Sequence, residues 1–405
     1  MKKTSDTSMI RPPATIAILG GGQLGSMLAH AARLMGYRTL CVSANDDDPA
    51  ARWADHHLTA DPGDAGVISR LANDVQVITV ETESIEPAAL AAAEKIGTRV
   101  APSWHVQTIV RDRRLEKNFL AANDLAVGAF RVVESAAQML QAAQELFDQG
   151  ATAILAKTAR GGYDGKGQRW IRTPDQAQNA WHALGQAPLV VEAKVDFVGE
   201  ASVIVARSPD GDMSAFPVFS NEHRHGILFQ TKMPADISES TAHAAVNLAR
   251  RAAECLQVVG LLAVEMFVLA DGRVLVNEMA ARPHNSGHVT LRAATRSQFE
   301  MHIAAICGLP LPKVEILRPA VMTNLLGDLW PVESAPAAAN AYPHPAPDWA
   351  TVLADGRATL HLYGKAPRPG RKMGHLIHTG HTAEEALSSA NAAFVSLENR
   401  QATKR

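Results

Sequence analysis

Two glutamates, Glu265 and Glu278, stand in otherwise apolar segments, LLAVEMFV and RVLVNEM. The dipeptide Asp271-Gly272 between them is typical of a two-residue hairpin turn. A hairpin centred on it places the carboxylates directly opposite each other, with Cβ atoms about 5 Å apart. Like charges there are destabilising unless a cation lies between them, and Mg²⁺ commonly takes one or two carboxylates together with nucleotide oxygens. The pattern predicts a Mg²⁺ site at this pair, with Asn277 as a further oxygen ligand; the alternative is a solvated sheet face.

A glycine-rich segment, Gly161–Gln168, follows a strand-like run that carries Lys157. Its four glycines in seven residues exceed what a two-residue turn needs, and such a loop can fold over a triphosphate with its N–H groups turned inward. A lysine at the end of the preceding strand can reach phosphate oxygens as a point charge. The segment is not a P-loop, because GxxxxGK(S/T) leading into a helix is absent. We predict a phosphate-binding loop, against the alternative of a glycine-rich hairpin turn.

The segment Gly20–Gly25 (GGGQLG) lies between a strand-like run and a run with helical spacing. It satisfies GxGxxG in the context that dinucleotide-binding proteins use, and a helix N-terminus favours an anion. Asp46 follows at a distance that suits a ribose acceptor, but it lies in a loop-like DDDP run. We predict that this turn meets a phosphate of a substrate other than a dinucleotide. The alternatives are a dinucleotide site and a tight strand–helix turn without a ligand.

The segment Arg282–His288 (RPHNSGH) follows the second acidic strand and shows neither helical nor strand periodicity. Loops crowded with polar donors beside a metal-binding strand are typical of anion sites. We predict an anion site here, with an ordinary polar loop as the alternative. A zinc site at His284 and His288 is conceivable, but no third ligand of fixed spacing is evident.

A cluster of four cations lies near the C-terminus: Lys365, Arg368, Arg371 and Lys372. Such a cluster can clamp a phosphate, and it is also typical of a solvated face. The residue types therefore predict several anion-binding segments and one acidic pair, which the fold has to bring together.

The elements of the first part alternate between strand-like and helix-like runs, which predicts a parallel, doubly wound α/β domain to about residue 110. The predicted strands are Thr15–Leu19, Arg38–Ser43 and Val75–Glu81, and the predicted helices follow Gly25 and cover Ala65–Ala72 and Pro87–Ile96.

The second part has a mixed α+β character with mostly hairpin connections. Its predicted helices cover Asp112–Ala122, Pro174–Leu184 and Ser238–Leu256, and its predicted strands include Ala153–Thr158, Leu189–Val195, Ser202–Arg207, Leu262–Leu269 and Arg273–Met279. A loop or linker is expected at Ala335–Pro347, which is rich in Ala and Pro. The expected divisions are a disordered lead-in (1–13), domains at 14–112, 113–315 and 316–395, and a tail (396–405).

Composition excludes several classes of protein. The 405 residues carry a formal net charge of −2, with 39 Lys and Arg against 41 Asp and Glu, so a dedicated nucleic-acid binder is not expected. No apolar run approaches the ~20 residues of a spanning helix, and residues 1–13 lack the apolar core of a secretory signal. The three dispersed cysteines, Cys41, Cys255 and Cys307, form no CxxC pair and fit a reducing cytoplasm.

These motifs resemble those of the ATP-grasp ligases and, within them, of the 5-(carboxyamino)imidazole ribonucleotide synthase family of purine biosynthesis. The resemblance spans about residues 15–376 and rests on GGGQLG, DRRLEKNFL, GGYDGKGQ, VEMF with VNEMAARPHNSGH, SQFEMHIAAICGLPLP and GRKMGH. It implies an α/β and α+β multidomain fold: a Rossmann-like pre-ATP-grasp domain, a two-lobed ATP-grasp domain and a small β-rich C-terminal domain. It also implies a homodimer that uses ATP and Mg²⁺ to carboxylate 5-aminoimidazole ribonucleotide with bicarbonate through carboxyphosphate.

The resemblance further implies a role for each matching residue. ATP would be bound by Arg113, Lys157, Gly162, Tyr163, Asp164, Gly165, Lys166, Gly167, Gln168, Glu192, Ala193, Lys194, Val195, Glu200, His223, Asn277 and Glu278. Mg²⁺ would be held by Glu265 and Glu278. The bicarbonate and amine site would be bordered by Arg282, His284, Asn285 and Ser286, with Tyr163, Asp164 and Lys166 closing on the substrate. The ribonucleotide would be held by Gln23, Glu81, Lys365, Arg371 and Lys372.

The chain departs from the family pattern at five positions. Thr82 and Ser84 stand where the family has Phe and Asn, Ala281 replaces a proline, Val289 an aromatic residue and His225 an acidic one. These differences concern substrate affinity more than the ATP chemistry, whose residues are all present.

Three rival functions remain at this point. The first is a formate-dependent glycinamide ribonucleotide transformylase, a related ligase that usually has Asp-Thr where this chain has Asn285-Ser286. The second is a non-catalytic nucleotide-binding module, which should lack a metal carboxylate or the phosphate-binding lysine. The third is an NAD-dependent oxidoreductase, and it rests on GxGxxG alone.

Overall fold

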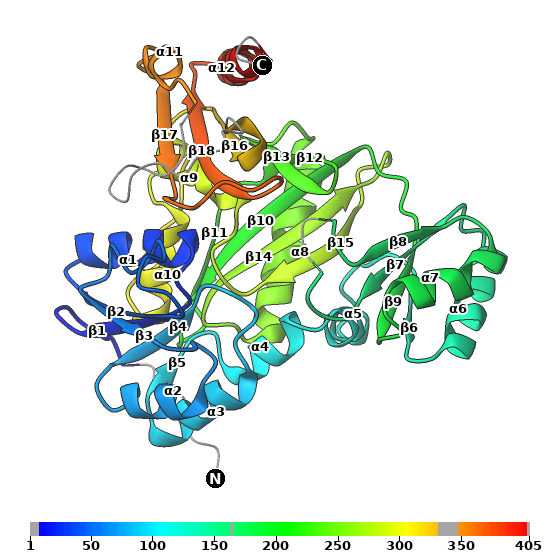
Figure 1. Ribbon diagram of the computed structural model, residues 1–405, viewed down its shortest axis with the longest axis horizontal. Coiled ribbons are helices and arrows are strands. Elements are labelled where there is room, and N and C mark those ends of the chain that lie inside the picture. Colours follow the sequence, from blue (N-terminus) through cyan, green and yellow to red (C-terminus); the bar gives the residue numbers. More distant parts are fainter. Residues whose placement is uncertain (1–7, 163–164, 331–346, 403–405) are drawn as a thin grey trace.

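The computed structural model describes residues 8–162, 165–330 and 347–402. Three β-sheets organise this part of the chain, one parallel and two antiparallel (Figure 1). The predicted combination of α/β and α+β domains is therefore confirmed. No helix within these ranges has both the length and the hydropathy that crossing a bilayer requires.

The first sheet is five-stranded and parallel, in the order β3-β2-β1-β4-β5. Its strands are β1 (Thr15–Leu19), β2 (Arg38–Ser43), β3 (His56–Thr59), β4 (Val77–Val80) and β5 (Arg99–Val100). Both faces are buried, which explains why the central strands read as continuous apolar runs. One face carries α2 (Ala65–Leu71) and α3 (Pro87–Ile96), and the other carries α1 (Gln23–Leu34) and α10 (Gln298–Ile306).

The segment just before β1 is held in place rather than disordered. The N–H of Ile10 donates to the carbonyl of Cys307 at 2.8 Å, and the hydroxyl of Tyr37 donates to the carbonyl of Ile10 at 2.7 Å. The disordered lead-in expected for residues 1–13 is therefore wrong for residues 8–13, while residues 1–7 lie outside the described residues.

The second sheet is four-stranded and antiparallel, in the order β6-β9-β7-β8. Its strands are β6 (Phe130–Val133), β7 (Ile154–Thr158), β8 (Gln168–Ile171) and β9 (Leu189–Ala193). The helices α6 (Ala136–Asp148) and α7 (Ala177–Ala183) cover one face, with η1 (Pro174–Gln176) leading into α7. Two further helices, α4 (Trp104–Val110) and α5 (Arg113–Ala122), connect this sheet to the parallel one. Asp112 caps α5 by accepting the N–H of Arg114.

The third sheet runs in the order β15-β14-β10-β12-β13-β16-β18-β17, with β11 paired to β10. Its strands are β10 (Gly199–Arg207), β11 (Met213–Ala215), β12 (Phe219–Arg224), β13 (Ile227–Met233), β14 (Gly260–Val268), β15 (Val274–Ala280), β16 (Ala320–Leu326), β17 (Ala358–Leu362) and β18 (Lys372–Thr379). The C-terminal strands therefore extend the sheet of the preceding part through the pairing of β13 with β16.

The remaining short elements are η2 (Ser286–Val289), α9 (Thr290–Ala293), η3 (Gly327–Leu329) and α11 (Ala350–Leu353). The last helix, α12 (Ala383–Ala402), continues without a break across 395/396, where the sequence predicts the start of a tail. Most of the predicted linker at Ala335–Pro347 lies outside the described residues.

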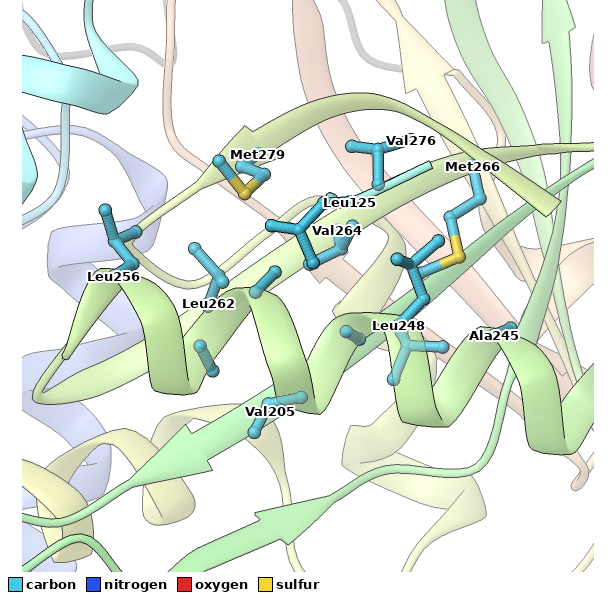
Figure 2. Close-up of a cluster of buried hydrophobic side chains, with 14 of the residues drawn as sticks. Leu125, Val205, Ala245, Leu248, Leu256, Leu262, Val264, Met266, Val276 and Met279 are labelled. Atoms are coloured by element: carbon cyan, nitrogen blue, oxygen red, sulfur yellow. The ribbon is translucent and has the colours of Figure 1, made fainter. Parts of the chain in front are cut away.

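The long helix α8 (Glu239–Leu256) packs on one face of the third sheet (Figure 2). Its buried side presents Leu248 and Leu256 together with several alanines, which let the helix lie close to the strands. Leu262 and Val264 of β14 face it from the sheet and are fully buried. This packing fixes the position of β14, the strand that carries Glu265 of the acidic pair.

We predict that Leu262→Ala lowers the free energy of unfolding by about 2–5 kcal/mol, because a buried leucine leaves a cavity when truncated. Urea denaturation at neutral pH measures the change. Leu34→Ala is the matched control: Leu34 is 76% exposed, so its loss should cost within about 0.5 kcal/mol. Equal effects of the two substitutions would contradict the packing of α8 on β14.

Candidate active site

One cavity of about 1540 Å³ is lined by residues from the parallel-sheet domain and from both antiparallel sheets. The predicted site residues on its wall are Gln23, Glu81, Arg113, Lys157, Gly162, Gly165, Lys166, Gln168, Glu192, Ala193, Lys194, Val195, Glu200, His223, Glu265, Asn277, Glu278, Arg282, His284, Asn285, Lys365, Arg371 and Lys372. Among the described residues that were predicted, Gly167 and Ser286 do not line it, and Tyr163 and Asp164 lie outside the described residues.

The acidic pair forms as predicted, with Glu265 of β14 directly opposite Glu278 of β15. The turn between the strands is not the predicted two-residue turn. The N–H of Gly272 donates to the carbonyl of Leu269 at 2.9 Å, and Gly272 has a φ of 83°, which is typical of a three-residue hairpin loop. A bulge that leaves Asn277 unpaired on β15 then shifts the register back by one residue. The two offsets cancel, so the pair forms although the predicted turn is wrong.

The electrostatics of this pair fit a bound cation. Burial, reinforced by the charge of Glu278, raises the pKa of Glu265 to about 7. Two facing carboxylates offer only oxygen donors, which suit Mg²⁺ when phosphate oxygens complete its shell. Among the described residues, no three His, Cys, Asp or Glu side chains converge on one point. A zinc site at His284 and His288 therefore lacks the third ligand that it would need.

Glu192 of β9 lies between two buried ammonium groups. Nζ of Lys117 is 2.9 Å from one of its carboxylate oxygens, and Nζ of Lys157 is 2.9 Å from the other. Although burial opposes ionisation, these two lysines lower the pKa of Glu192 to about 2. The same lysines reach the bulge, because Lys117 donates to the carbonyl of Asn277 at 2.8 Å and Lys157 to its side-chain oxygen at 3.4 Å. The bulge and Glu192 thus fix Lys157 beside the acidic pair.

The sequence analysis missed Lys117, which does not line the cavity but contacts two residues that do, Glu192 and Asn277. Its side chain is 2% exposed. Lys117 lies on α5 next to Glu116, a buried acid that lines the cavity. Burial raises the pKa of Glu116 to about 8, with Lys117 opposing the shift. The sequence contained one indication of this contact: two charged residues, Glu116 and Lys117, lie in the middle of the amphipathic segment RRLEKNFLAA. Charged residues are rarely buried without a partner.

The glycine-rich loop is anchored by Arg113, the first residue of α5. Its guanidinium donates to the carbonyl of Thr158 at 2.9 Å and to the carbonyl of Gly162. Gly165 and Gly167 have φ values of 76° and 66°, which favour glycine. Arg113 therefore holds the start of the loop against the end of β7, and Gly162, Gly165, Lys166 and Gln168 line the cavity.

Another part of the wall combines an ion pair with an aromatic stack. Nδ1 of His223 lies 2.8 Å from a carboxylate oxygen of Glu200, and although burial opposes the shift, this hydrogen bond raises the pKa of His223. Phe197 and Phe267 stack with ring centroids 4.6 Å apart. Both rings line the cavity. Phe267 was missed because an aromatic residue in an apolar strand reads as core, and Phe197 lies in the loop between β9 and β10, where no motif marks it.

Glu81 follows β4, and its carboxylate occupies the turn Gly20–Gly25. The N–H of Gly22 donates to one of its oxygens at 2.6 Å and the N–H of Gly25 to the other at 3.0 Å. A Cβ at Gly20 would lie 2.4 Å from Cγ of Glu81, so the turn needs glycine there. A carboxylate of the chain itself therefore accepts two of the N–H groups at the start of α1. Gln23 of this turn lines the cavity, and its contact with a phosphate of a substrate stays a prediction.

All four cations of the predicted C-terminal cluster line the cavity. Nζ of Lys365 donates to the side-chain oxygen of Gln23, which joins residues 342 positions apart. Burial lowers the pKa of Lys365 to about 8; Glu81 opposes this shift, and Arg371 and Lys372 add to it. The first and last predicted motifs therefore form one wall.

The segment RPHNSGH is tied to both neighbouring domains. Nη2 of Arg282 lies 2.5 Å from a carboxylate oxygen of Glu83, which follows β4. Asn285 and Asn324 of β16 exchange amide hydrogen bonds of 3.1 and 2.6 Å. These contacts place the segment on the cavity wall between the parallel sheet and the C-terminal strands.

Gln298, in the SQFE motif, clamps the backbone of the same segment. Its Oε1 accepts the N–H of His284 at 2.8 Å, and its Nε2 donates to the carbonyl of His284 at 2.7 Å. A Cβ at Gly287 would lie 2.3 Å from Oε1 of Gln298. The two motifs therefore belong together for a physical reason that their spacing in the sequence does not reveal.

His284 stands next to the acidic pair. Its Nε2 lies 3.4 Å from a carboxylate oxygen of Glu265. Burial, helped by the nearby charges of Arg282 and Lys372, lowers the pKa of His284 well below 6.5. Ser286 lies behind the imidazole, fully buried, with its hydroxyl 2.9 Å from Nδ1. Ser286 does not line the cavity, and its hydroxyl contacts His284, which does.

Comparison with known proteins bears on this arrangement. Three family models match the chain: the Ribonucleotide synthetase preATP-grasp domain at residues 13–111, the ATP-grasp domain at 118–299 and the Phosphoribosylaminoimidazole carboxylase C-terminal domain at 320–389. An N5-carboxyaminoimidazole ribonucleotide synthase of Bacillus subtilis is 39% identical over 396 residues, which cover 97% of this chain and 99% of that protein. The chain belongs to the N5-carboxyaminoimidazole ribonucleotide synthase family.

Solved structures of this family agree with the fold. The ADP complex of one N5-carboxyaminoimidazole ribonucleotide synthetase superposes with a TM-score of 0.86 at 36% identity, covering 97% of this chain and 99% of that one. The enzyme of Aspergillus clavatus, in complex with ADP and 5-aminoimidazole ribonucleotide, superposes with a TM-score of 0.84 at 28% identity, covering 95% and 99%. The expected membership of the ATP-grasp ligases is confirmed.

The five departures from the synthase pattern fall into two groups. Ala281 and Val289 are buried in hydrophobic clusters, so they pack against the third sheet. Thr82, Ser84 and His225 line the cavity. Only these three are placed to affect a ligand of the synthase directly.

We predict that Glu192→Gln lowers the stability of the ligand-free protein by about 3–5 kcal/mol near neutral pH, because it leaves two buried lysines without their counter-charge. The folded-state pKa of Glu192, about 2, lies below its ordinary value of 4.5. Its stabilisation is therefore complete above pH 4.5 and is lost as the pH falls toward 2. Urea denaturation across this range should show wild type and variant converging.

Glu134→Gln is the control for this prediction. The Glu134 side chain is 57% exposed in its pair with Arg114, so the substitution should cost at most about 1 kcal/mol. A gap between wild type and Glu192→Gln that stays constant from pH 4.5 to 2 would contradict the buried ion pair.

Proposed function

We propose that the protein carboxylates the amine of 5-aminoimidazole ribonucleotide with bicarbonate, using ATP and giving 5-carboxyaminoimidazole ribonucleotide, ADP and phosphate for purine biosynthesis. One observation carries this proposal. The acidic pair Glu265 and Glu278 and the cationic wall around Lys365 face the same cavity. That cavity can hold two phosphorylated ligands with their reacting groups between them, and the near full-length similarity to synthases supports the assignment.

ATP would lie between the second and third sheets. The glycine-rich loop and Lys157 are suited to its phosphates, since backbone N–H groups and an ammonium group both stabilise a triphosphate. Glu200 would accept hydrogen bonds from the ribose, with residues 192–195 and the stacked Phe197 and Phe267 on the adenine side. Adenine stacks well on an aromatic face.

Mg²⁺ would be held by Glu265 and Glu278 together with phosphate oxygens of ATP. When bound, it would offset the charge of the transferred phosphoryl group. The oxygen-only donor set of the facing carboxylates supports this choice.

The reaction would proceed in two steps. A bicarbonate oxygen attacks the γ-phosphorus of ATP, and the bond from this phosphorus to the bridging oxygen of ADP breaks, which forms carboxyphosphate. The amine then attacks the carboxyl carbon, loses a proton, and phosphate leaves. Carboxyphosphate is short-lived in water, so the glycine-rich loop would exclude solvent while the amine is held nearby.

The remaining ligand contacts follow from the geometry of the walls. Arg282, His284 and Asn285 would border bicarbonate and the amine. Lys365, Arg371 and Lys372 would hold the ribonucleotide phosphate, because three cations beside one another favour a dianion. Gln23 and Glu81 would contact the ribose, with Lys166 closing from the loop. We also propose that the protein works in the cytoplasm as a homodimer, a state that sedimentation velocity would test.

We predict that 5-aminoimidazole ribonucleotide stimulates ADP release from Mg-ATP and bicarbonate, and that Glu278→Gln lowers the stimulated rate by about 100-fold or more, because a metal ion contributes several kcal/mol at the phosphoryl group. A coupled ADP assay measures both rates. Glu254→Gln on the exposed side of α8 is the control and should leave the rate unchanged.

Two results would overturn the proposal. ATP binding without stimulated turnover would remove the assigned substrate. Stimulation by formate with glycinamide ribonucleotide, in place of bicarbonate with aminoimidazole ribonucleotide, would make the protein a transformylase. The Asn285-Ser286 pair argues against that outcome.

A further inference from the structure

A row of buried polar side chains crosses neighbouring strands of the third sheet and ends at the cavity. The strand register places Ser202 of β10 opposite Glu265 of β14, and Asn221 of β12 opposite Thr231 of β13. Ser202, Asn221 and Thr231 are all buried. Burying polar groups is unfavourable unless their hydrogen bonds are made, so their partners are informative.

These side chains form one continuous chain of hydrogen bonds. The hydroxyl of Thr231 donates to Oδ1 of Asn221 at 3.0 Å, and Nδ2 of Asn221 donates to the hydroxyl of Ser202 at 2.9 Å. The hydroxyl of Ser202 donates to that of Ser286 at 3.0 Å, and the Ser286 hydroxyl lies 2.9 Å from Nδ1 of His284. The chain therefore connects β13 to the imidazole beside the acidic pair.

The hydrogen bonds of this row all run in one direction, from Thr231 toward His284. An amide nitrogen can only donate, so the hydroxyl of Ser202 accepts from Asn221, and the geometry has it donate its own proton to Ser286. Ser286 then has its proton free to donate to Nδ1 of His284. The backbone N–H of Ser286 also donates to this same Nδ1, at 3.3 Å. An imidazole nitrogen that accepts two hydrogen bonds carries no proton.

The proton of His284 must therefore sit on Nε2, the nitrogen that faces Glu265 at 3.4 Å. Which ring nitrogen is protonated is set by the hydrogen bond that the other makes. A histidine fixed in this way presents a donor to the cavity, and it cannot act there as an acceptor.

We propose that Thr231, Asn221 and Ser202 are positioning residues that act through Ser286 to hold His284 as its Nε2–H tautomer. His284 then donates a hydrogen bond to a carboxylate oxygen in the cavity. The identity of that oxygen rests on the proposed function: it belongs to bicarbonate or carboxyphosphate, whose negative charge a preorganised donor stabilises. The tautomer itself follows from the hydrogen bonds and does not depend on the reaction.

The first test reads the protonation of the two ring nitrogens of His284 directly. Nitrogen NMR of the full-length protein labelled with ¹⁵N-histidine distinguishes a protonated from an unprotonated ring nitrogen, and the signals of His284 are those missing from His284→Ala. We expect a protonated Nε2 and an unprotonated Nδ1 in the wild type. A protonated Nδ1 on His284 would overturn the proposal, even if the protein proves to have another substrate.

The second test asks whether Ser202 acts through His284. Ser202→Ala should lower kcat by about 10-fold, as loss of an outer hydrogen-bond partner typically does, and should leave KM for ATP unchanged. In a His284→Ala background the same substitution should cause no further loss, because the group it positions is gone. Equal losses in both backgrounds would assign Ser202 a merely structural role and refute the proposal.

Ser214→Ala provides the matched control. Ser214 is buried in β11 and donates to the carbonyl of Pro312 at 2.7 Å. Its substitution therefore removes a buried serine hydroxyl that does not belong to the row of hydrogen bonds leading to His284. We expect Ser214→Ala to leave kcat and the tautomer of His284 unchanged. A loss of kcat as large as that of Ser202→Ala would show that deleting any buried hydroxyl has this effect, and would overturn the proposal.

Discussion

The pairing of Glu265 with Glu278 is the constraint on which the rest of the site depends. Two carboxylates facing each other in an apolar sheet repel, and burial makes the repulsion stronger. Packing rather than charge keeps them together, because the apolar side chains of α8 pack against β14 and β15 in one hydrophobic cluster. The two carboxylates create a concentrated negative charge that no side chain of β14 or β15 neutralises. This charge suits the site to a cation and, through the cation, to a phosphorylated ligand.

Three cations around the cavity are each paired with an acceptor from the chain itself. Lys157 pairs with Glu192, Arg282 with Glu83, and Lys365 with Gln23. The last two pairs join separate domains, so the cavity exists in this form only when the domains are packed together. A ligand that enters meets groups already held in position, and less ordering is left for the moment of binding.

The sequence predicts local features of this site better than its internal partners. Strands such as Thr15–Leu19 and Arg38–Ser43 were predicted with their observed bounds, because each has apolar residues at its centre and a polar residue at its start. The register of Glu265 with Glu278 was also correct, although a longer turn and a bulge had to cancel. What could not be predicted were contacts between distant segments: Glu81 filling its glycine turn, Lys117 reaching Glu192, and Gln298 holding His284. A spacing within one segment carries no information on which group from another segment will contact it.

His284 shows how much of such a site lies outside the residues that touch a ligand. Gln298 fixes its backbone through two hydrogen bonds, while the chain from Thr231 reaches its ring through Ser286. If only the position of the ring mattered, the backbone clamp and close packing would be enough. A buried hydroxyl–amide–hydroxyl chain with one direction does something that packing cannot, because it determines which nitrogen carries the proton. The polar row across the third sheet is therefore best explained by a requirement for a hydrogen-bond donor, and not only for an imidazole, beside the acidic pair.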